Sequence, residues 1–452
     1  MDFTKKKVLI VGTKKSGMAA LSLLKSHGAD TVLYDGNEEL KEADIRAELP
    51  DGVTTDICIG KMPEELKKSI DLVVISPGVP IDSPLVLEFK EMQVPVWGEI
   101  ELAYAFEKGK VLAITGTNGK TTTTALLGQI MEDATSKAIT VGNIGIPYTQ
   151  MVSGTMEDSV TVAEISSFQL ETVYEFKPVV SAILNVTPDH LNRHHTMECY
   201  VETKEKIAAK QTKEETCVLN YEDAYTRAFG EKCSAKVVYF ASAHELENGF
   251  YLKDHVIYKA ENGKAVRLIA MEETRLLGVH NAENIMAAIA MADSYGIPME
   301  QILATVKEFR AVEHRIEYVA TKKGVDYYND SKGTNPDAAI KGIGAMVKPT
   351  FLIGGGYDKN ADYTEWIRSF DGKVRYLVLI GQTKEKIAET AKRCGFHQIV
   401  MCENMPEAME FCTEHARPGD AVLLSPACAS WGEFDNYEQR GDRFKEYVHK
   451  LS

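Results

Sequence analysis

The sequence predicts an α/β protein of about three domains, because its length divides into units of ~150 residues. Short apolar runs rich in β-branched residues alternate with amphipathic stretches near both ends of the chain. This alternation is typical of parallel sheets covered by helices. Between these two regions, an apolar run passes through a loop of glycine and threonine into a stretch with helical periodicity. The middle of the chain is therefore expected to form a further α/β unit.

The first domain is predicted to begin with a strand. In MDFTKKKVLIVG only VLIV separates the basic residues from Gly12, which is too short for a signal peptide. The next turn, GTKKSG at 12–17, would match the dinucleotide pattern G-x-G-x-x-G if Lys14 were glycine. A nucleotide-like ligand and a plain structural turn both stay open, and Asp35 at the end of TVLYD does not decide between them.

The second domain contains the glycine and threonine loop. In VLAITGTNGKTTTTALLGQI, Gly116 and Gly119 turn the chain between a predicted strand and a predicted helix. A helix N-terminus attracts anions, Lys120 adds a positive charge, and the Thr121 hydroxyl suits magnesium. Thr115 holds the place of the first glycine in the standard phosphate-loop pattern. We nevertheless interpret the loop as a phosphate site rather than an ordinary strand-to-helix turn.

Polar residues follow two further apolar runs of this domain. Glu164 ends VTVAE, and Asp189 and His190 follow VVSAILNVTP. Ligands of open α/β sheets gather at the carboxyl ends of parallel strands, so Glu164 is a candidate magnesium ligand. The alternatives are a solvated acid for Glu164 and a local hydrogen bond for His190.

The helix predicted over 197–210 carries a lysine, Lys204, in the middle of its apolar face. This lysine either reaches the surface or is desolvated, which lowers the pKa of its amine and makes it reactive. A neutral amine can act as a nucleophile, or combine with carbon dioxide into a carbamate that holds a second metal ion. The apolar residues that share its face at 3.6-residue spacing are Met197, Tyr200, Val201, Ile207 and Ala208.

The second domain is expected to end with a hairpin and two helices. Short alternating strands between 249 and 277 surround Glu261-Asn262-Gly263, which is typical of a hairpin turn. The central sheet is therefore predicted to be mixed. The stretches HNAENIMAAIAMADSYG and PMEQILATVKEF are predicted helices.

A third α/β domain is predicted from residue 312 onwards. In NDSKGTNPDAA, a turn with Asp330, Ser331, Lys332 and Thr334 precedes a helix that Asn335 would cap. Capping explains Asn335 and the proline after it, but not a lysine beside an aspartate, so the turn is a second candidate anion site. Another apolar run ends in SPACASWGEFDNYEQRG, where core packing is the alternative to a site.

The composition excludes several classes of function. A formal net charge of −15 argues against nucleic-acid and membrane-surface binding, since both depend on basic patches. The longest apolar runs fall short of the ~20 residues that span a bilayer. The 8 cysteines contain no C-x-x-C pair, which indicates neither a zinc site nor a disulfide framework and favours reduced thiols in the cytoplasm.

Taken together, the motifs resemble those of the Mur ligases, in order and over essentially the whole chain. They are GTNGKTT, EISSFQLE, NVTPDHLNRH, YVETKEKI, HNAENIMAA, EHRIE, NDSKGTNPDA and LLSPACASWGEFDNYEQRGDRF. The resemblance implies three domains: a Rossmann-like UDP-substrate-binding domain at 1–107, a P-loop ATPase domain with a mixed sheet at 108–311, and a Rossmann-like amino-acid-binding domain at 312–452.

The resemblance also implies an ATP-dependent amide ligase of peptidoglycan precursor synthesis, acting in the cytoplasm as a monomer. Its last motifs are similar to those of the member that joins D-glutamate to UDP-N-acetylmuramoyl-L-alanine. In the family, the substrate carboxylate attacks the γ-phosphate of ATP to give an acyl phosphate, which the amine of the amino acid then attacks.

Residue roles follow from the resemblance, with Lys120, His190 and Lys204 as the implied catalytic residues. The implied ATP contacts are Gly116, Thr117, Asn118, Gly119, Lys120, Thr121, Thr122, Asn281, Asn284, Arg315 and Asp330. Two Mg²⁺ sites are implied, the first at Thr121 and Glu164, the second at His190 and the carbamate of Lys204. The implied substrate contacts are Asn143, Ser166 and His190 for the UDP-sugar, and Lys332, Thr334, Lys359, Ser430, Trp431 and Tyr437 for D-glutamate. Lys14 and Gly36 depart from the family pattern, so the uridine contacts are not assigned.

Two other functions compete with this interpretation. A ligase of the same superfamily that extends folate with glutamate shares the phosphate loop and the three-domain plan, but is not expected to end in SPACASWGEFDNYEQRG. A non-enzymatic P-loop switch would carry a guanine-reading N-K-x-D stretch, which the sequence lacks. ADP release that depends on a UDP-muramoyl substrate would separate the three.

Overall fold

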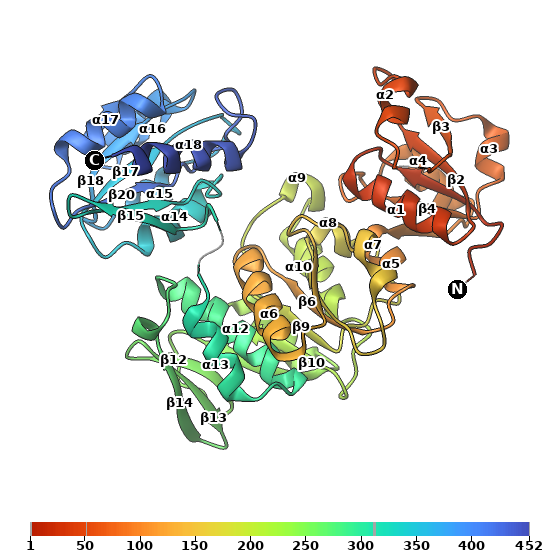
Figure 1. Ribbon diagram of the computed structural model, residues 1–452, viewed down its shortest axis with the longest axis horizontal. Coiled ribbons are helices and arrows are strands. Elements are labelled where there is room, and N and C mark those ends of the chain that lie inside the picture. Colours follow the sequence, from red (N-terminus) through yellow and green to blue (C-terminus); the bar gives the residue numbers. More distant parts are fainter. Residues whose placement is uncertain (1, 51, 311–312, 452) are drawn as a thin grey trace. The chain divides into compact units, whose positions relative to one another are not determined.

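The computed structural model describes residues 2–50, 52–310 and 313–451. It contains three sheets, of five, nine and six strands, with helices packed around each (Figure 1). The predicted α/β class with three domains is confirmed. By its contacts the chain divides into two compact units, Met1–Ala270 with Glu283–Lys307 and Met271–Ala282 with Glu308–Ser452. The first unit holds the sheets of five and nine strands, and the second holds the sheet of six.

The first sheet has the order β3-β2-β1-β4-β5, with every pair parallel. Helix α1 packs closely on β1, since a Cβ at Gly17 would lie 1.8 Å from the carbonyl oxygen of Gly12. This close approach requires Gly17, and the left-handed φ of 108° at Gly12 favours glycine there too. The elements are β1 (Lys7–Val11), α1 (Lys15–Ser26), β2 (Asp30–Asp35), α2 (Glu42–Ala47), β3 (Asp56–Ile59), α3 (Glu64–Lys68), β4 (Leu72–Ile75), α4 (Pro84–Glu91), β5 (Val96–Gly98) and α5 (Glu99–Tyr104).

The second sheet has the order β14-β13-β12-β11-β10-β9-β6-β8-β7 and is mixed, as predicted. Its core is parallel, and β13 pairs antiparallel with both β12 and β14. The strands are β6 (Lys110–Thr115), β7 (Ala138–Gly142), β8 (Val160–Glu164), β9 (Val180–Ile183), β10 (Thr216–Asn220), β11 (Lys236–Ala241), β12 (Gly249–Lys253), β13 (Val256–Glu261) and β14 (Lys264–Ala270).

Two tight turns join the antiparallel strands. The predicted one is confirmed, with left-handed φ values of 51° at Asn262 and 74° at Gly263. The run GFYLKDHVIY, expected to be strand, contains the other turn, with φ values of 48° at Asp254 and 62° at His255. Aspartate and histidine adopt positive φ more readily than most other residues. These two residues could therefore have indicated the turn, but the run was predicted as strand throughout.

Helices of the middle part of the chain follow the predicted pattern. The one predicted over 197–210 is shorter, because the α-helix ends at Glu205 and a single 3₁₀ turn follows. The elements are α6 (Lys120–Thr135), α7 (Tyr148–Met151), η1 (Val152–Gly154), α8 (Ser167–Leu170), α9 (Leu191–His194), α10 (Met197–Glu205), η2 (Lys206–Ala208), α11 (Ala224–Lys232), η3 (Met271–Glu273), α12 (Val279–Tyr295) and α13 (Met299–Glu308).

The third sheet has the order β15-β16-β20-β17-β18-β19, parallel except for the edge strand β15. Asn335 caps α14 as predicted, accepting a hydrogen bond from Ala338 N at 2.8 Å. The elements are β15 (Glu317–Lys322), β16 (Val325–Asn329), α14 (Pro336–Gly344), β17 (Thr350–Gly354), α15 (Thr364–Arg368), β18 (Val374–Leu379), α16 (Lys384–Arg393), β19 (Ile399–Met401), α17 (Met405–His415), β20 (Ala421–Leu424) and α18 (Tyr437–Lys450).

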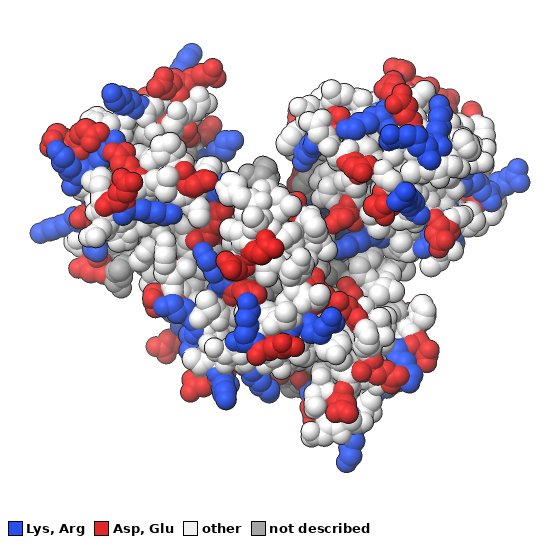
Figure 2. Space-filling model, turned by 180° about the vertical axis from the view of Figure 1, so that it is seen from behind, with Lys and Arg blue, Asp and Glu red and all other residues white. Residues whose placement is uncertain are grey.

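The surface carries charges of both signs. Acidic and basic side chains are interspersed over the face drawn in Figure 2. Within the described part of the chain, no helix is both long and apolar enough to cross a bilayer.

Candidate active site

The phosphate loop lies between β6 and α6, and its glycines are required by the backbone. Gly119 has a φ of 85°, and a Cβ there would lie 2.3 Å from Asn284 Oδ1. Gly119 is also the N-cap residue of α6 and supplies no side-chain cap. Because the first N–H groups of a helix lack intrahelical partners, this end of α6 suits an anion.

The loop is held in shape by residues of the segment after β9. Asn185 accepts hydrogen bonds from Thr117 N through its carbonyl oxygen (2.9 Å) and from Asn118 N through Oδ1 (2.8 Å). The Thr117 hydroxyl donates to Thr187 O at 3.1 Å and lies 3.1 Å from the Tyr200 hydroxyl. Asn185 and Tyr200 lie in motifs that carry the family resemblance, but neither was predicted to hold the loop.

Two lysines converge on one carbonyl oxygen of this loop. Lys120 Nζ and Lys204 Nζ each donate to Gly116 O at 2.9 Å. Lys204 is 1% exposed and lies over the Tyr200 ring, 4.6 Å from its centroid. Burial, reinforced by the Lys120 charge, holds the pKa of Lys204 well below its usual value. The alternative of a lysine that reaches the surface is wrong.

Glu164 is the last residue of β8, and one of its carboxylate oxygens accepts no hydrogen bond from the described residues. The residue is 1% exposed, and Asn143 Nδ2 donates to its Oε1 at 2.8 Å. Its Oε2 is buried and finds no hydrogen-bond partner among the residues that the structure describes. A buried carboxylate oxygen without a donor suits a cation. The alternative of a solvated acid is therefore wrong, whereas magnesium binding stays a prediction.

A magnesium ion at this place would depend on few protein ligands. Across residues 2–50, 52–310 and 313–451, no three His, Cys, Asp or Glu side chains gather as a metal cluster. Mg²⁺ commonly takes one or two protein oxygens and completes its shell with water and phosphate. Glu164 lies in register with Ile114 of β6, just before the loop, and Thr121 is 4% exposed at the start of α6. These two residues fit such a site.

His190 is the N-cap residue of α9, in the segment that follows β9. It adopts a φ of 53°, and its ring lies 4.9 Å from that of Phe168. Its Nε2 lies 3.5 Å from Asp189 Oδ2, and its side chain is 50% exposed. The Asp189 charge also acts on Lys204, whose pKa it raises against the effect of burial. A second metal site at His190 and Lys204 stays a prediction.

Three further predicted contacts have structural partners. Asn284 Oδ1 accepts from Thr123 Oγ1 at 3.3 Å, and Asn281 Nδ2 donates to Leu277 O at 2.7 Å. Ser166 caps α8 through a reciprocal capping box with Gln169. These bonds explain the residue types without a ligand, so their contacts with nucleotide and substrate stay predictions. Thr122 is buried in the first turn of α6.

The first domain has a cleft of about 530 Å³ at the carboxyl ends of its strands. Gly12, Asp35 and Gly36 line it, together with the stretches 78–80 and 83–85. The hydroxyl of Ser83 is buried beside it and lacks a partner in the described part of the chain. A ligand with polar groups fits this place.

In the second unit, Asp330 directly follows β16 and is 5% exposed. Ser425 Oγ donates to its Oδ2 at 2.6 Å. Burial raises the pKa of Asp330 to about 7, while Ser425 and the Arg315 charge act in the opposite direction. Arg315 Nε is buried without a partner among the described residues. Both residues thus have capacity for a polar ligand.

Replacing Asp330 with asparagine is expected to flatten the pH dependence of stability. Folding raises the pKa of this carboxyl from 3.8 to about 7. The protonated carboxyl therefore adds to the free energy of unfolding at low pH, and this contribution is lost as pH rises from about 4 to about 7. The loss is about 4 kcal/mol at most. Urea unfolding of the ligand-free protein should show the parent losing stability between about pH 4 and about pH 7, and Asp330→Asn losing less. Equal slopes would show that Asp330 titrates normally.

Four of the other predicted residues of the third domain form two pairs, each of a lysine and an aromatic ring. Lys332 Nζ lies 5.2 Å from the Tyr437 ring centroid, and Lys359 Nζ lies 4.8 Å from that of Trp431. Trp431 is 54% exposed, so core packing does not explain it. Thr334 N donates to Lys332 O at 2.8 Å. Ser430, at 4% exposed, lies in the segment before Trp431.

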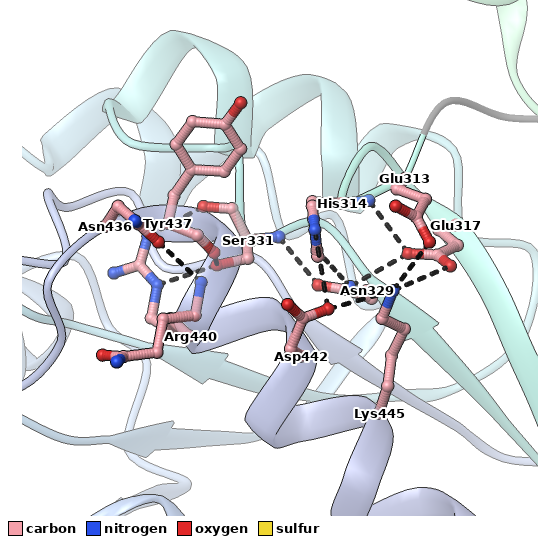
Figure 3. A network of polar contacts seen from close by, with 11 residues as sticks. Glu313, His314, Glu317, Asn329, Ser331, Asn436, Tyr437, Arg440, Asp442 and Lys445 are labelled. Carbon is pink, nitrogen blue, oxygen red and sulfur yellow. Dashed lines mark hydrogen bonds and ion pairs between the residues drawn. The ribbon is translucent and has the colours of Figure 1, made fainter.

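A buried arginine joins the loop of Lys332 to the loop of Trp431, and Figure 3 shows its contact with Ser331. Arg440 Nε donates to Ser331 Oγ at 2.9 Å and its Nη2 to Ser331 O at 2.8 Å, while Nη1 donates to Cys428 O at 3.1 Å. Arg440 is 1% exposed, and burial lowers its pKa to about 10. This arginine lies in the last of the family motifs, but its motif alone does not predict a role for it.

Comparison with known proteins identifies the family. The MurD-like N-terminal domain of Mur ligases matches residues 6–98, the Mur ligase middle domain 114–292, and the Mur ligase glutamate ligase domain 314–428. The chain belongs to the Mur ligase family. The family resemblance inferred from the motifs is thereby confirmed, and with it the prediction of an ATP-dependent ligase in peptidoglycan synthesis.

Individual relatives match the Mur ligase chain along its whole length. It is 56% identical over 452 residues to the UDP-N-acetylmuramoylalanine–D-glutamate ligase of Lachnoclostridium phytofermentans, covering 100% of this chain and 99% of that one. The protein of the same name from Lachnospira eligens is 58% identical, with 100% of both covered. The crystal structure of the Thermotoga maritima UDP-N-acetylmuramate-alanine ligase MurC superposes with a TM-score of 0.60 at 20% identity, over 99% and 100% of the two chains. That likeness shows a common fold.

Proposed function

We propose that this Mur ligase adds D-glutamate to UDP-N-acetylmuramoyl-L-alanine with consumption of ATP. The observation that carries the proposal is the full-length identity of 56% and 58% to two relatives that bear this name. The buried loop site and the paired lysines of the third domain support the same reaction.

The proposed chemistry begins with attack of the substrate carboxylate on the γ-phosphate of ATP. The loop and the N-terminus of α6 hold the phosphates, and Lys120 neutralises charge as the phosphoryl group moves. The product is an acyl phosphate and ADP. The amine of D-glutamate then attacks the acyl carbon, the amide bond forms as the nitrogen loses a proton to solvent, and phosphate leaves with the bonding electron pair. When bound at Thr121 and Glu164, Mg²⁺ would offset phosphate charge.

The substrates are proposed to occupy separate sites in the first and third domains. The cleft beside Asp35 takes the uridine part of the nucleotide sugar. D-Glutamate has two carboxylates, and the third domain offers two ammonium groups, Lys332 and Lys359, each over an aromatic ring. The charges therefore match. We further propose that the protein is a monomer that acts in the cytoplasm, a compartment in keeping with its eight free cysteines.

Measurement of ADP formation tests this function. The protein is mixed with ATP, Mg²⁺ and UDP-N-acetylmuramoyl-L-alanine, and each candidate amino acid is added in turn. ADP formation is expected to require the nucleotide sugar and to be fastest with D-glutamate. ADP formation with a folate substrate and L-glutamate instead would contradict the proposal, and so would nucleotide binding without turnover.

Replacing Glu164 with glutamine is expected to weaken magnesium binding. The amide keeps its contact with Asn143 but loses the negative charge of the unpartnered oxygen. The Mg²⁺ concentration for half-maximal ADP formation should rise on the order of 10–100-fold. Glu157→Gln, at an exposed acid in the turn before β8, is the control and should leave the Mg²⁺ curve unchanged. An unshifted curve for Glu164→Gln would contradict the assignment.

A further inference from the structure

Arg193 connects the first domain to the segment that carries His190. It lies on α9, three residues after His190, and its side chain is 11% exposed. Its Nη2 donates to the carbonyl oxygen of Val79 at 2.8 Å. Val79 lines the first-domain cleft. A residue of the segment that carries His190 is thus bonded directly to a residue that lines the proposed nucleotide-sugar cleft.

The guanidinium of Arg193 is fixed by a second partner. Glu171, whose side chain is 4% exposed, accepts from Nε at 3.1 Å through Oε1 and from Nη2 at 2.5 Å through Oε2. A planar guanidinium can make this paired contact and still reach a carbonyl oxygen, whereas an ammonium lacks the fork. The arrangement therefore holds the arginine at one angle.

Further contacts connect Arg193 to two segments of the second domain, the one that carries His190 and the phosphate loop. The guanidinium lies over the Phe168 ring, 4.9 Å from its centroid, and the His190 ring lies 4.9 Å from the same centroid. The neighbouring His194 lies 5.1 Å from the Tyr200 ring. The Tyr200 hydroxyl in turn lies 3.1 Å from Thr117 Oγ1 in the phosphate loop.

We infer that Arg193 is a positioning residue that couples occupancy of the first-domain cleft to nucleotide binding at the phosphate loop. A nucleotide sugar that orders the cleft wall at Val79 favours the bonded position of Arg193, and so of α9, Phe168 and His190. By linkage, each ligand then strengthens the binding of the other by the same factor. Such coupling would limit loss of ATP to water before the carboxylate arrives. The inference depends on the proposed function for the identity of the cleft ligand.

The test measures the affinity of a non-hydrolysable ATP analogue by titration calorimetry, with and without UDP-N-acetylmuramoyl-L-alanine and in the presence of Mg²⁺. The parent is expected to bind the analogue about 5-fold or more tightly when the sugar is present. In Arg193→Met this ratio should fall towards one, while affinity for the analogue alone stays within about 2-fold. Arg193→Lys should recover little, because it lacks the fork. A purely structural role would not change the ratio selectively.

Controls separate this inference from the proposed function. Arg46→Met breaks an exposed ion pair with Glu42 of 2.6 Å and should keep the parent ratio. If Arg193→Met fails to fold, Glu171→Gln, which removes the charge that fixes the arginine, should lower the ratio in the same direction. A ratio near the parent's in folded Arg193→Met, or in Glu171→Gln, would overturn the inference alone. A parent that does not bind the nucleotide sugar would overturn both this inference and the proposed function.

Discussion

Lys120→Ala is expected to lose ATP turnover by about 10²–10³-fold or more, as for removal of one well-placed group that stabilises transition-state charge. Lys120 reaches the loop carbonyls of Gly116 and Thr117 at 2.9 and 3.0 Å, so its ammonium lies where the phosphates would bind. The substitution removes that charge and leaves the glycines that shape the loop. ADP release at saturating substrates measures the effect, and the melting curve followed by circular dichroism should change little.

A matched lysine of the same strand serves as the control for this variant. Lys110 begins β6 and is exposed, with its Nζ 5.4 Å from the Tyr295 ring centroid. Lys110→Ala should turn over ATP at the parent rate. Near-normal turnover in Lys120→Ala would show that the phosphate-loop interpretation is wrong, however well the loop fits an anion.

Features set by local sequence could be predicted. The loop between β6 and α6 depends on glycines at fixed offsets, so its existence follows from a few consecutive residues. The position of Glu164 at a strand end, and of Lys204 on an apolar helical face, likewise follow from periodicity. The structure added that both are buried, with Lys204 bonded to a residue 88 positions earlier.

Features set by long-range contacts could not be predicted. Arg440 bonds to Ser331 across 109 positions, and Arg193 bonds to Val79 across 114. The residues around each arginine do not predict its hydrogen-bond partner, because the two segments come together only when the sheets assemble. The resemblance assigned residues that contact ligands and omitted these two, whose bonds hold other parts of the protein in place.

A positive charge on Lys204 is unfavourable where this side chain lies, and conversion to a carbamate would replace it with a negative charge. Its ammonium and that of Lys120 both donate to the carbonyl oxygen of Gly116, and Lys204 is almost fully buried. Two like charges so close disfavour each other, and burial disfavours the charge on Lys204 further, so its pKa is lowered. We predict that the neutral amine attacks carbon dioxide, so that a C–N bond would form and one proton would leave to solvent. The resulting anion would face Lys120 as an opposite charge.

Lys204→Arg is therefore expected to be inactive although it keeps a long basic side chain, because the site is expected to need an anion. Lys204→Ala should lose about 10²–10³-fold in rate while keeping its melting temperature, and added acetate or propionate should restore part of the activity by entering the vacated space. Lys210→Ala, at an exposed lysine paired with Glu175 at 2.8 Å, should be active and indifferent to acetate. ADP formation measures all three variants.

The parent protein offers a separate check on the carbamate, independent of any substitution. Removing carbon dioxide and bicarbonate from the buffer should lower ADP formation, and adding bicarbonate should restore it. ¹³C-labelled bicarbonate should give a carbamate resonance in the parent that is missing in Lys204→Ala. If Lys204→Arg works as well as the parent, or if the parent stays fully active without carbon dioxide and shows no resonance, then Lys204 is not carbamylated. Its burial against the Gly116 carbonyl would then serve only to hold the phosphate loop in shape.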